Sequence, residues 1–158
     1  MSVKVSLNEG EAAIATIASV MRYCVNRAAG VKDKKGGPQS NYYTDLHGFG
    51  AELAFGKHRN LYPDLGTSPR SGGSDFINAN GEEIDIKCTQ YKTGKLIVNE
   101  KKKNSSTKYF VLMIGEVPDF EIIGYATSDE IFKDENKKEL YGRTVYQLEQ
   151  CQLHSMQE

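Results

Sequence analysis

The feature that most constrains the fold is a succession of short strand-like segments between residues 75 and 126, with helical patterns before and after it. Turns rich in Gly, Asn, Ser and Lys separate these segments. Strands are expected at 75–78, 82–89, 95–99, 109–115 and 121–126. A helical start, a run of strands and a covering helix together predict a mixed α/β fold around one sheet.

A first helix is expected over residues 8–29, where apolar residues recur at steps of three and four and Gly30 follows as a stop. The recurring residues are Ile14, Ile17, Ala18, Met21, Val25 and Ala28. This apolar stripe is expected to pack into the core.

A second helix is expected over residues 46–59, with Asp45 as its N-cap. Three glycines interrupt it, Gly48, Gly50 and Gly56. Each glycine costs about 1 kcal/mol relative to alanine, so close approach to a sheet or a ligand is expected to offset them. Glu52 lies at the boundary of the apolar stripe of this helix.

Two segments have the composition of loops, 31–44 and 61–74. Tyr42 and Tyr43 could stack on nucleic-acid bases or, alternatively, pack against the following helix. After the strands, residues 128–141 resemble a polar helix capped by Ser128, and a last strand is expected at 144–148.

The length of 158 residues suits one domain. Its expected parts are an N-terminal helix and loop (1–44), a core (45–126) and a C-terminal helix and strand (127–158). No apolar run approaches the roughly 20 residues of a membrane span, and the N-terminus lacks the apolar core of a secretion signal. The sequence therefore predicts a cytoplasmic protein without a membrane partner.

The net charge of −1 conceals an uneven distribution. Residues 1–110 carry +5, and residues 111–158 carry −6. One face could therefore meet a polyanion, although a solvated lysine-rich surface would give the same pattern.

The most informative stretch is the expected hairpin SDFINANGEEIDIKC, residues 74–88. Asp85 and Lys87 are two apart and share one face of its second strand. A two-residue turn would put Asp75 on the opposite face from Asp85, whereas a three-residue loop with a left-handed glycine would pair Asp75 with Asp85. The second register is preferred, because it buries the apolar residues of both strands together.

In that register Asp75 and Asp85 face each other, and opposed carboxylates repel unless a cation or proton lies between them. A divalent-metal site is therefore expected there, completed by the backbone carbonyl of Ile86, since Mg²⁺ prefers carboxylate oxygens, waters and a substrate phosphate. Lys87 is placed to hold or activate a metal-bound water and to neutralise transition-state charge. The alternative is a surface hairpin with a solvated ion pair.

A helix with Glu52, then a hairpin with Asp75 and the sequence Asp85-Ile86-Lys87, resembles the PD-(D/E)xK nuclease superfamily, and small phage and bacterial members in particular. The resemblance covers about residues 45–126 and includes the segment GFGAE, the approach GGSD and the apolar strand YFVLMIG. It implies a restriction-endonuclease-like core, a central mixed β-sheet flanked by helices. It also implies that Glu52, Asp75 and Asp85 bind Mg²⁺ or Mn²⁺ and that Lys87 positions the attacking water.

Two departures from the family pattern are present. Ser74 stands where the name-giving proline would be, and no Gln-x-x-x-Tyr follows on a helix, because Gln90 and Tyr91 come too soon. The chain is therefore not assigned to the recombination-exonuclease branch.

A group of lysines follows the proposed catalytic lysine and would suit a sequence-independent grip on phosphates. Its members are Lys92, Lys95, Lys101, Lys102, Lys103 and Lys108. Solvated loop lysines are the alternative interpretation of this group.

The sequence thus predicts a Mg²⁺-dependent deoxyribonuclease that hydrolyses phosphodiester bonds of DNA, in a bacterial or phage-infected cell. The alternatives are a non-cleaving nucleic-acid-binding module or complex subunit on the same fold, and a partner-binding protein that uses its acidic C-terminal part. Endonuclease and exonuclease remain open. Cleavage of both strands would favour a homodimer with two sites.

Overall fold

The computed structural model describes residues 2–31, 40–69 and 73–156, so most of the expected loop 31–44 and part of the loop 61–74 lie outside the described residues. Two long helices are present, α1 (Glu9–Ala28) and α2 (Asn41–Arg59), and a short one, α3 (Ser128–Ile131). The strands are β1 (Val3–Ser6), β2 (Phe76–Ile77), β3 (Glu83–Thr89), β4 (Leu96–Asn99), β5 (Thr107–Glu116), β6 (Asp119–Thr127), β7 (Lys137–Leu140) and β8 (Arg143–Leu148). Within these ranges, no helix is both long and apolar enough to cross a membrane.

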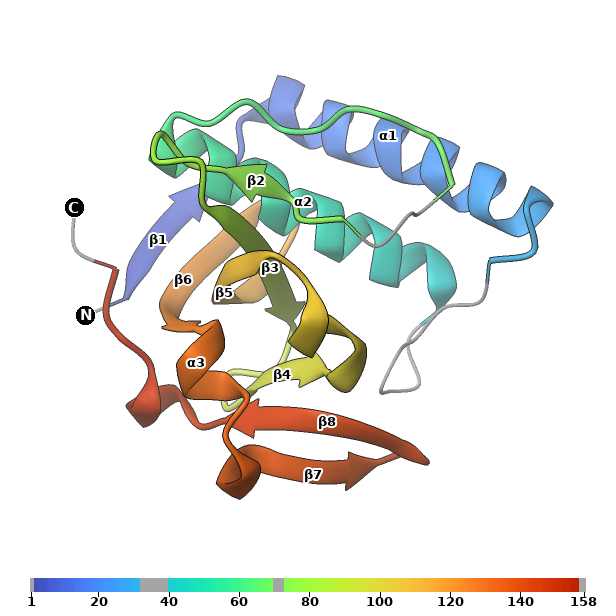
Figure 1. The fold of residues 1–158 in the computed structure, drawn as a ribbon. Helices are drawn as coiled ribbons and strands as arrows, with labels where there is room; N and C mark the ends of the chain where they lie inside the picture. Colours follow the sequence, from blue (N-terminus) through green and yellow to red (C-terminus); the bar gives the residue numbers. More distant parts are fainter. Residues whose placement is uncertain (1, 32–39, 70–72, 157–158) are drawn as a thin grey trace.

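The strands form two sheets rather than the single sheet expected from the sequence (Figure 1). The larger sheet has the order β1-β6-β5-β3-β2, in which β3 and β5 are parallel and the other neighbours antiparallel. The smaller sheet has the order β4-β8-β7. The parallel strands β3 and β5 need a crossover connection, and β4 forms part of it. This strand does not join the larger sheet but pairs with β8, the last strand of the chain's described part. The expected mixed α/β fold with a central mixed sheet and flanking helices is confirmed.

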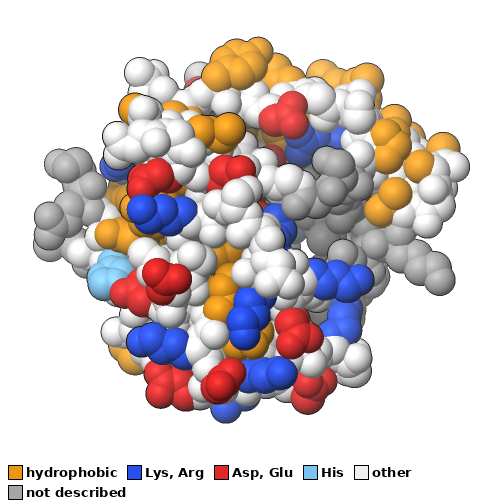
Figure 2. All heavy atoms as spheres, viewed as in Figure 1, with side chains coloured by type: hydrophobic (Ala, Val, Ile, Leu, Met, Phe, Trp, Pro, Cys, Tyr) orange, Lys and Arg blue, Asp and Glu red, His pale blue; other side chains and the backbone are white. Residues whose placement is uncertain are grey.

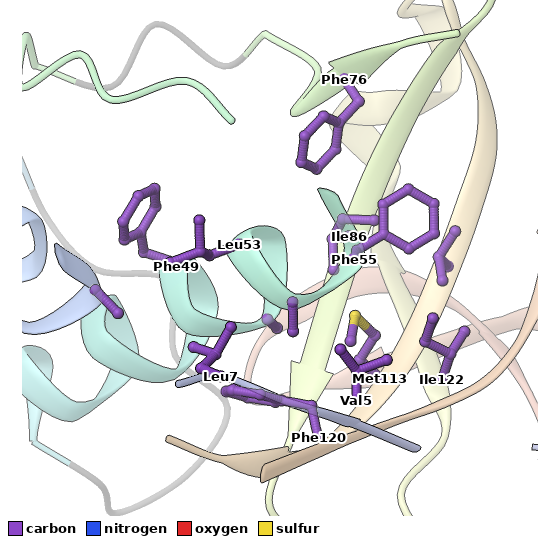
Figure 3. Close-up of a cluster of buried hydrophobic side chains, with 14 of the residues drawn as sticks. Val5, Leu7, Phe49, Leu53, Phe55, Phe76, Ile86, Met113, Phe120 and Ile122 are labelled. Atoms are coloured by element: carbon purple, nitrogen blue, oxygen red, sulfur yellow. The ribbon is translucent and has the colours of Figure 1, made fainter. Parts of the chain in front are cut away.

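Both faces of the larger sheet are covered. One face packs on α2 through a core in which Phe49 and Phe55 of the helix meet Ile86 and Met113 of the sheet (Figure 3). The other face packs on α3 and the smaller sheet through a second core that includes Phe110 of β5 and Tyr146 of β8. This two-sided burial explains the continuous apolar run in β5.

Helix α2 begins earlier than the sequence suggested, at Asn41 with Ser40 as N-cap instead of Asp45. Tyr42 and Tyr43 therefore lie within its first turn, and the ring of Tyr43 stacks on His47 at 5.6 Å between centroids. This packing is the alternative role that the sequence left open for these tyrosines.

Two of the three glycines of α2, Gly50 and Gly56, are explained by the expected close approach, whereas Gly48 has no such neighbour among the described residues. A Cβ on Gly50 would lie 2.7 Å from a methyl carbon of Val117 and 2.9 Å from the ring of Phe120. A Cβ on Gly56 would lie 2.9 Å from the carbonyl oxygen of Leu61. The helix therefore needs glycine at these two positions to reach the sheet and the following loop.

Helix α1 has the expected bounds, but the prediction that its large apolar residues pack into the core is wrong. Ala18 is buried, whereas Ile14, Ile17 and Met21 are 46%, 61% and 49% exposed. The inward face is instead made of small and polar residues, namely Ala15, Ala18, Ser19, Arg22 and Asn26. Small side chains allow close contact with α2, and the polar ones bond to α2 and the loop after it.

The C-terminal part corrects two further expectations. Residues 128–141 do not form one helix, because α3 ends at Ile131 and β7 follows as a strand. Tyr141 and Gly142 have φ values of 50° and 71°, which is the two-residue turn that joins antiparallel strands with the correct twist. The strand β1 was not expected from the sequence, and it pairs with β6 at the edge of the sheet.

The close approach at Gly56 gives a stability prediction with an internal control. Gly56→Ala is expected to destabilise the fold by about 2 kcal/mol, because the new methyl group would meet the Leu61 carbonyl and the Phe76 ring, 3.1 Å away. Gly48→Ala is expected to stabilise it by about 1 kcal/mol, since no described residue outside the adjoining turns of α2 lies within 4 Å of a Cβ there. Urea denaturation of both variants measures the difference, and equal effects would contradict the packing.

Candidate metal centre at the edge of the sheet

The hairpin β2–β3 adopts the register that was preferred from the sequence. Phe76 pairs with Ile84, and the Asn78 N–H donates to the Glu82 carbonyl at 3.0 Å. Gly81 closes the three-residue loop with φ +77°. Asp75, one residue before β2, donates its N–H to the Ile84 carbonyl at 3.0 Å and so lies beside β3 near Asp85.

Strand β2 is two residues long, and within the described ranges no strand pairs with the edge of β3 beyond it. There the N–H of Ile86 donates to Oδ2 of Asp75 at 2.6 Å. The N–H and the carbonyl of one residue in a strand point to the same side, so the Ile86 carbonyl is directed to this edge too. An acidic side chain and a backbone acceptor therefore meet at the open edge.

Asp85 lies on the face of β3 opposite α2 and is 3% exposed. Two lysines compensate its charge. Lys87 forms an ion pair with Oδ2, and Nζ of Lys102 lies 3.0 Å from Oδ1 while donating to the Gly73 carbonyl at 2.9 Å. Lys102 follows β4 in the chain and was predicted to bind nucleic acid. In the structure its ammonium contacts the carboxylate of Asp85.

Glu52 approaches from α2. Nη1 of Arg22 lies 3.4 Å from Oε2 of Glu52, and the side chain of each residue is 19% exposed. The same guanidinium donates to the carbonyls of Asp64 and Gly66 and lies 4.3 Å from the ring centroid of Phe49. Arg22 therefore links α1, α2 and the loop before β2 at the carboxylate of Glu52.

The three carboxylates influence one another electrostatically. Burial, with the nearby Asp75 charge as the second cause, raises the pKa of Glu52 to about 8. Burial and then the charge of Asp85 raise the pKa of Asp75 to about 6, against the lowering effect of the Ile86 N–H. These carboxyl groups would repel one another if all were ionised, so either protons or a bound cation would relieve the arrangement.

The chemistry of this donor set fits a hard divalent cation. Two or three carboxylates with a backbone carbonyl supply the oxygen ligands that Mg²⁺ or Mn²⁺ prefers. Within the described ranges, no three His, Cys, Asp or Glu side chains already stand in a metal-ready cluster. In this structure the positive charge beside the carboxylates comes from side chains, namely Arg22 beside Glu52 and Lys87 and Lys102 beside Asp85.

A pocket of about 550 Å³ between α1, α2 and the segment before β2 reaches Glu52 and Asp75, whereas Asp85 and Lys87 do not line it. Its walls include Arg22, Gly48, Phe49, Glu52, Ser74 and Asp75. Gly48 contributes no side chain to this wall, so the pocket reaches the backbone of α2.

A larger hollow of about 760 Å³ lies elsewhere, where Arg59, Tyr125 and His154 are among its lining residues. Of the described residues that line it, Glu82 is the one carboxylate, and it pairs with Lys108 at 2.5 Å. Of these two hollows, the smaller is the one whose walls include Glu52 and Asp75. A third hollow of about 1040 Å³ is lined by the carboxylates of Glu116, Asp119 and Glu121, away from the candidate site.

The remaining predicted nucleic-acid lysines are spread over the surface. Lys95 pairs with Glu149 at 2.6 Å and Lys108 pairs with Glu82, while the ammonium of Lys103 lies 5.5 Å from the ring centroid of Tyr146. Lys92 and Lys101 are exposed. Figure 2 shows basic and acidic side chains interspersed over the lower half of this view, where the smaller sheet lies.

The sequence did not lead us to expect Arg22 at the candidate site. A signal was present, because Ala15, Ser19, Arg22 and Asn26 recur at steps of four, three and four, opposite the large apolar residues. A helix face of small and polar residues can be an inward face when its partner helix carries buried polar groups.

Comparisons with known proteins found no match for this chain among family models, curated proteins or solved structures.

The raised pKa of Glu52 predicts a pH-dependent stability. Because an ordinary glutamate has a pKa of 4.5 and Glu52 about 8, the folded protein holds a proton that the unfolded chain releases between these values. With a chelator present, stability is therefore expected to fall as the pH rises from about 4.5 to about 8.

Glu52→Gln removes this titration and keeps an acceptor for Arg22. It is expected to flatten the decline and to raise stability at pH 8 by on the order of 3 kcal/mol, measured by urea denaturation across the pH range. The exposed Glu135→Gln serves as control, and an undiminished slope in Glu52→Gln would contradict the assignment of the buried charge.

Proposed function

We propose that this protein is a metal-dependent nuclease that hydrolyses phosphodiester bonds of DNA on a restriction-endonuclease-like core. The observation that carries the proposal is the placement of two carboxylates on β3, where Asp75 accepts from the Ile86 N–H at 2.6 Å and Asp85 pairs with Lys87. Glu52 of α2 lines the same pocket as Asp75. The resemblance of the helix-hairpin motif to PD-(D/E)xK nucleases supports the same function.

In this proposal Asp75, Asp85 and the Ile86 carbonyl hold Mg²⁺ or Mn²⁺, and Glu52 completes the site from α2. The bound ion would supply Lewis-acid stabilisation of a phosphate oxygen and a more acidic water. Lys87 is placed beside Asp85 with its side chain 32% exposed, so its ammonium is accessible to a water or a phosphate at the edge of the sheet.

Arg22 is a positioning residue in this scheme. Its bonds to the Asp64 and Gly66 carbonyls and to Glu52 keep the Glu52 carboxylate directed toward the edge of the sheet. The lysines after β3 would hold the phosphate backbone without reading the sequence. These lysines lie before β4, after β4 and on β5, and this spread suits contacts to several phosphates rather than to one.

A non-cleaving nucleic-acid-binding module is the second candidate. The observation that favours it is the compensation of Asp85 by both Lys87 and Lys102, which neutralises the carboxylate without a metal. The two candidates differ in whether a divalent cation binds and whether DNA is cut.

Cleavage of DNA is the direct test. The wild-type protein is expected to nick or degrade at least one of duplex, single-stranded, flapped or branched DNA with Mg²⁺ or Mn²⁺ and to be inactive with a chelator. Lys87→Ala is expected to lower the rate by about a thousandfold, because it removes the cation beside the attacked phosphate. The exposed Lys133→Ala is the matched control, and circular dichroism checks the fold. No metal-dependent cleavage of any substrate would refute the enzyme.

Lys102 gives a prediction about metal affinity. Its ammonium pairs with the Asp85 carboxylate that a metal would use, so it must move or be displaced when a cation binds. Lys102→Met is therefore expected to bind Mn²⁺ about tenfold more tightly in calorimetry, since one competing positive charge is removed. The exposed neighbour in Lys101→Met is expected to leave the affinity unchanged, and weaker binding by Lys102→Met would contradict competition.

A further inference from the structure

Helix α1 presents its large apolar residues to solvent. Ile14, Ile17, Val20 and Met21 are 46%, 61%, 43% and 49% exposed, and Cys24 is exposed beside them. Hydrophobic side chains gather at the upper right margin of Figure 2, where Figure 1 places α1. A continuous apolar face of this kind marks an interaction surface.

The face extends along the whole helix. Gly10, Ile14, Ile17, Met21, Cys24 and Ala28 follow one another at alternating steps of four and three, and all are exposed. This spacing is the one by which two helices pack side by side, with each row seated against the other. The opposite face of α1 already contacts α2, so the exposed row has no partner within the described part of the chain.

The row is symmetric about residue 19. In an antiparallel pair related by a twofold axis there, Ile17 of one copy would meet Met21 of the other, and Ile14 would meet Cys24. Large side chains would then fill the centre, and the small Gly10 and Ala28 would meet at both ends. The surface is thus complementary to itself, which is what a twofold interface requires.

The charges favour the same arrangement. The first turn of α1 carries Glu9 and also Glu11, whose charge Lys57 already pairs at 2.7 Å, and the last turn carries Arg27. An antiparallel pair places each acidic end beside a basic end and opposes the two helix dipoles, whereas a parallel pair brings like charges together.

We infer that this protein forms a homodimer through antiparallel pairing of the exposed face of α1 with that of a second copy. A helix of 20 residues is about 30 Å long, so the contact is at the small end of specific interfaces and predicts a concentration-dependent dimer. Arg22 lies on the opposite side of the same helix, so the dimer would hold two carboxylate sites at a fixed separation.

Sedimentation velocity over about a hundredfold range of concentration tests the dimer. Wild-type protein is expected to shift from monomer to dimer, and Ile17→Asp is expected to remain monomeric. Thr16→Asp, an exposed neighbour on the flank of the helix, is expected to dimerise like the wild type. A wild type that remains monomeric throughout, or an Ile17→Asp variant that still dimerises, would overturn the inference.

Disulfide trapping tests the orientation, in a background where the exposed Cys151 is replaced by serine. Ile14→Cys is expected to form a covalent dimer through the native Cys24 of the second copy, and Thr16→Cys is not. Rapid cross-linking through Cys24 alone would indicate a parallel pair and overturn the antiparallel one. If the protein stays monomeric and co-floats with anionic lipid vesicles, and if Ile17→Asp abolishes this vesicle binding, the exposed face of α1 binds a membrane surface and the dimer is overturned.

Discussion

The other parts of the fold depend on the compensation of buried carboxylate charges at the edge of the larger sheet. Glu52, Asp75 and Asp85 are largely buried, and isolated buried carboxylates are costly unless cations or protons accompany them. The cations come from separate places, with Arg22 on α1 and Lys102 after β4. Packing of the two helices and of the smaller sheet therefore depends on the same charges that make the candidate site.

The local features of this site could be predicted from the sequence because they depend on neighbouring residues. The spacing of Asp85 and Lys87 determines that they share a face, and Gly81 permits the left-handed turn that pairs Phe76 with Ile84 and brings Asp75 beside β3. The glycines of α2 likewise indicated a close approach, which the packing of Gly56 confirms. Alternation and turn chemistry were sufficient for these predictions.

The features that could not be predicted depend on contacts between distant segments. The inward face of α1 follows from Arg22 and its partners on α2 and the next loop, and apolar periodicity alone pointed to the opposite face. The position of Lys102 follows from the pairing of β4 with β8, some fifty residues later in the chain. Residues 137–140 became a strand because Tyr141 and Gly142 turn the chain back, which overrides their helical propensity.

The bond from Ile86 to Asp75 also bears on how the protein avoids self-assembly through its sheet. An exposed strand edge offers unpaired N–H groups to any passing extended chain, and this is the usual beginning of strand-mediated aggregation. Here a carboxylate occupies the first such donor beyond β2, and its charge would repel an incoming backbone carbonyl. The acidic residue of the candidate metal site thus also acts as a gatekeeper against β-strand addition.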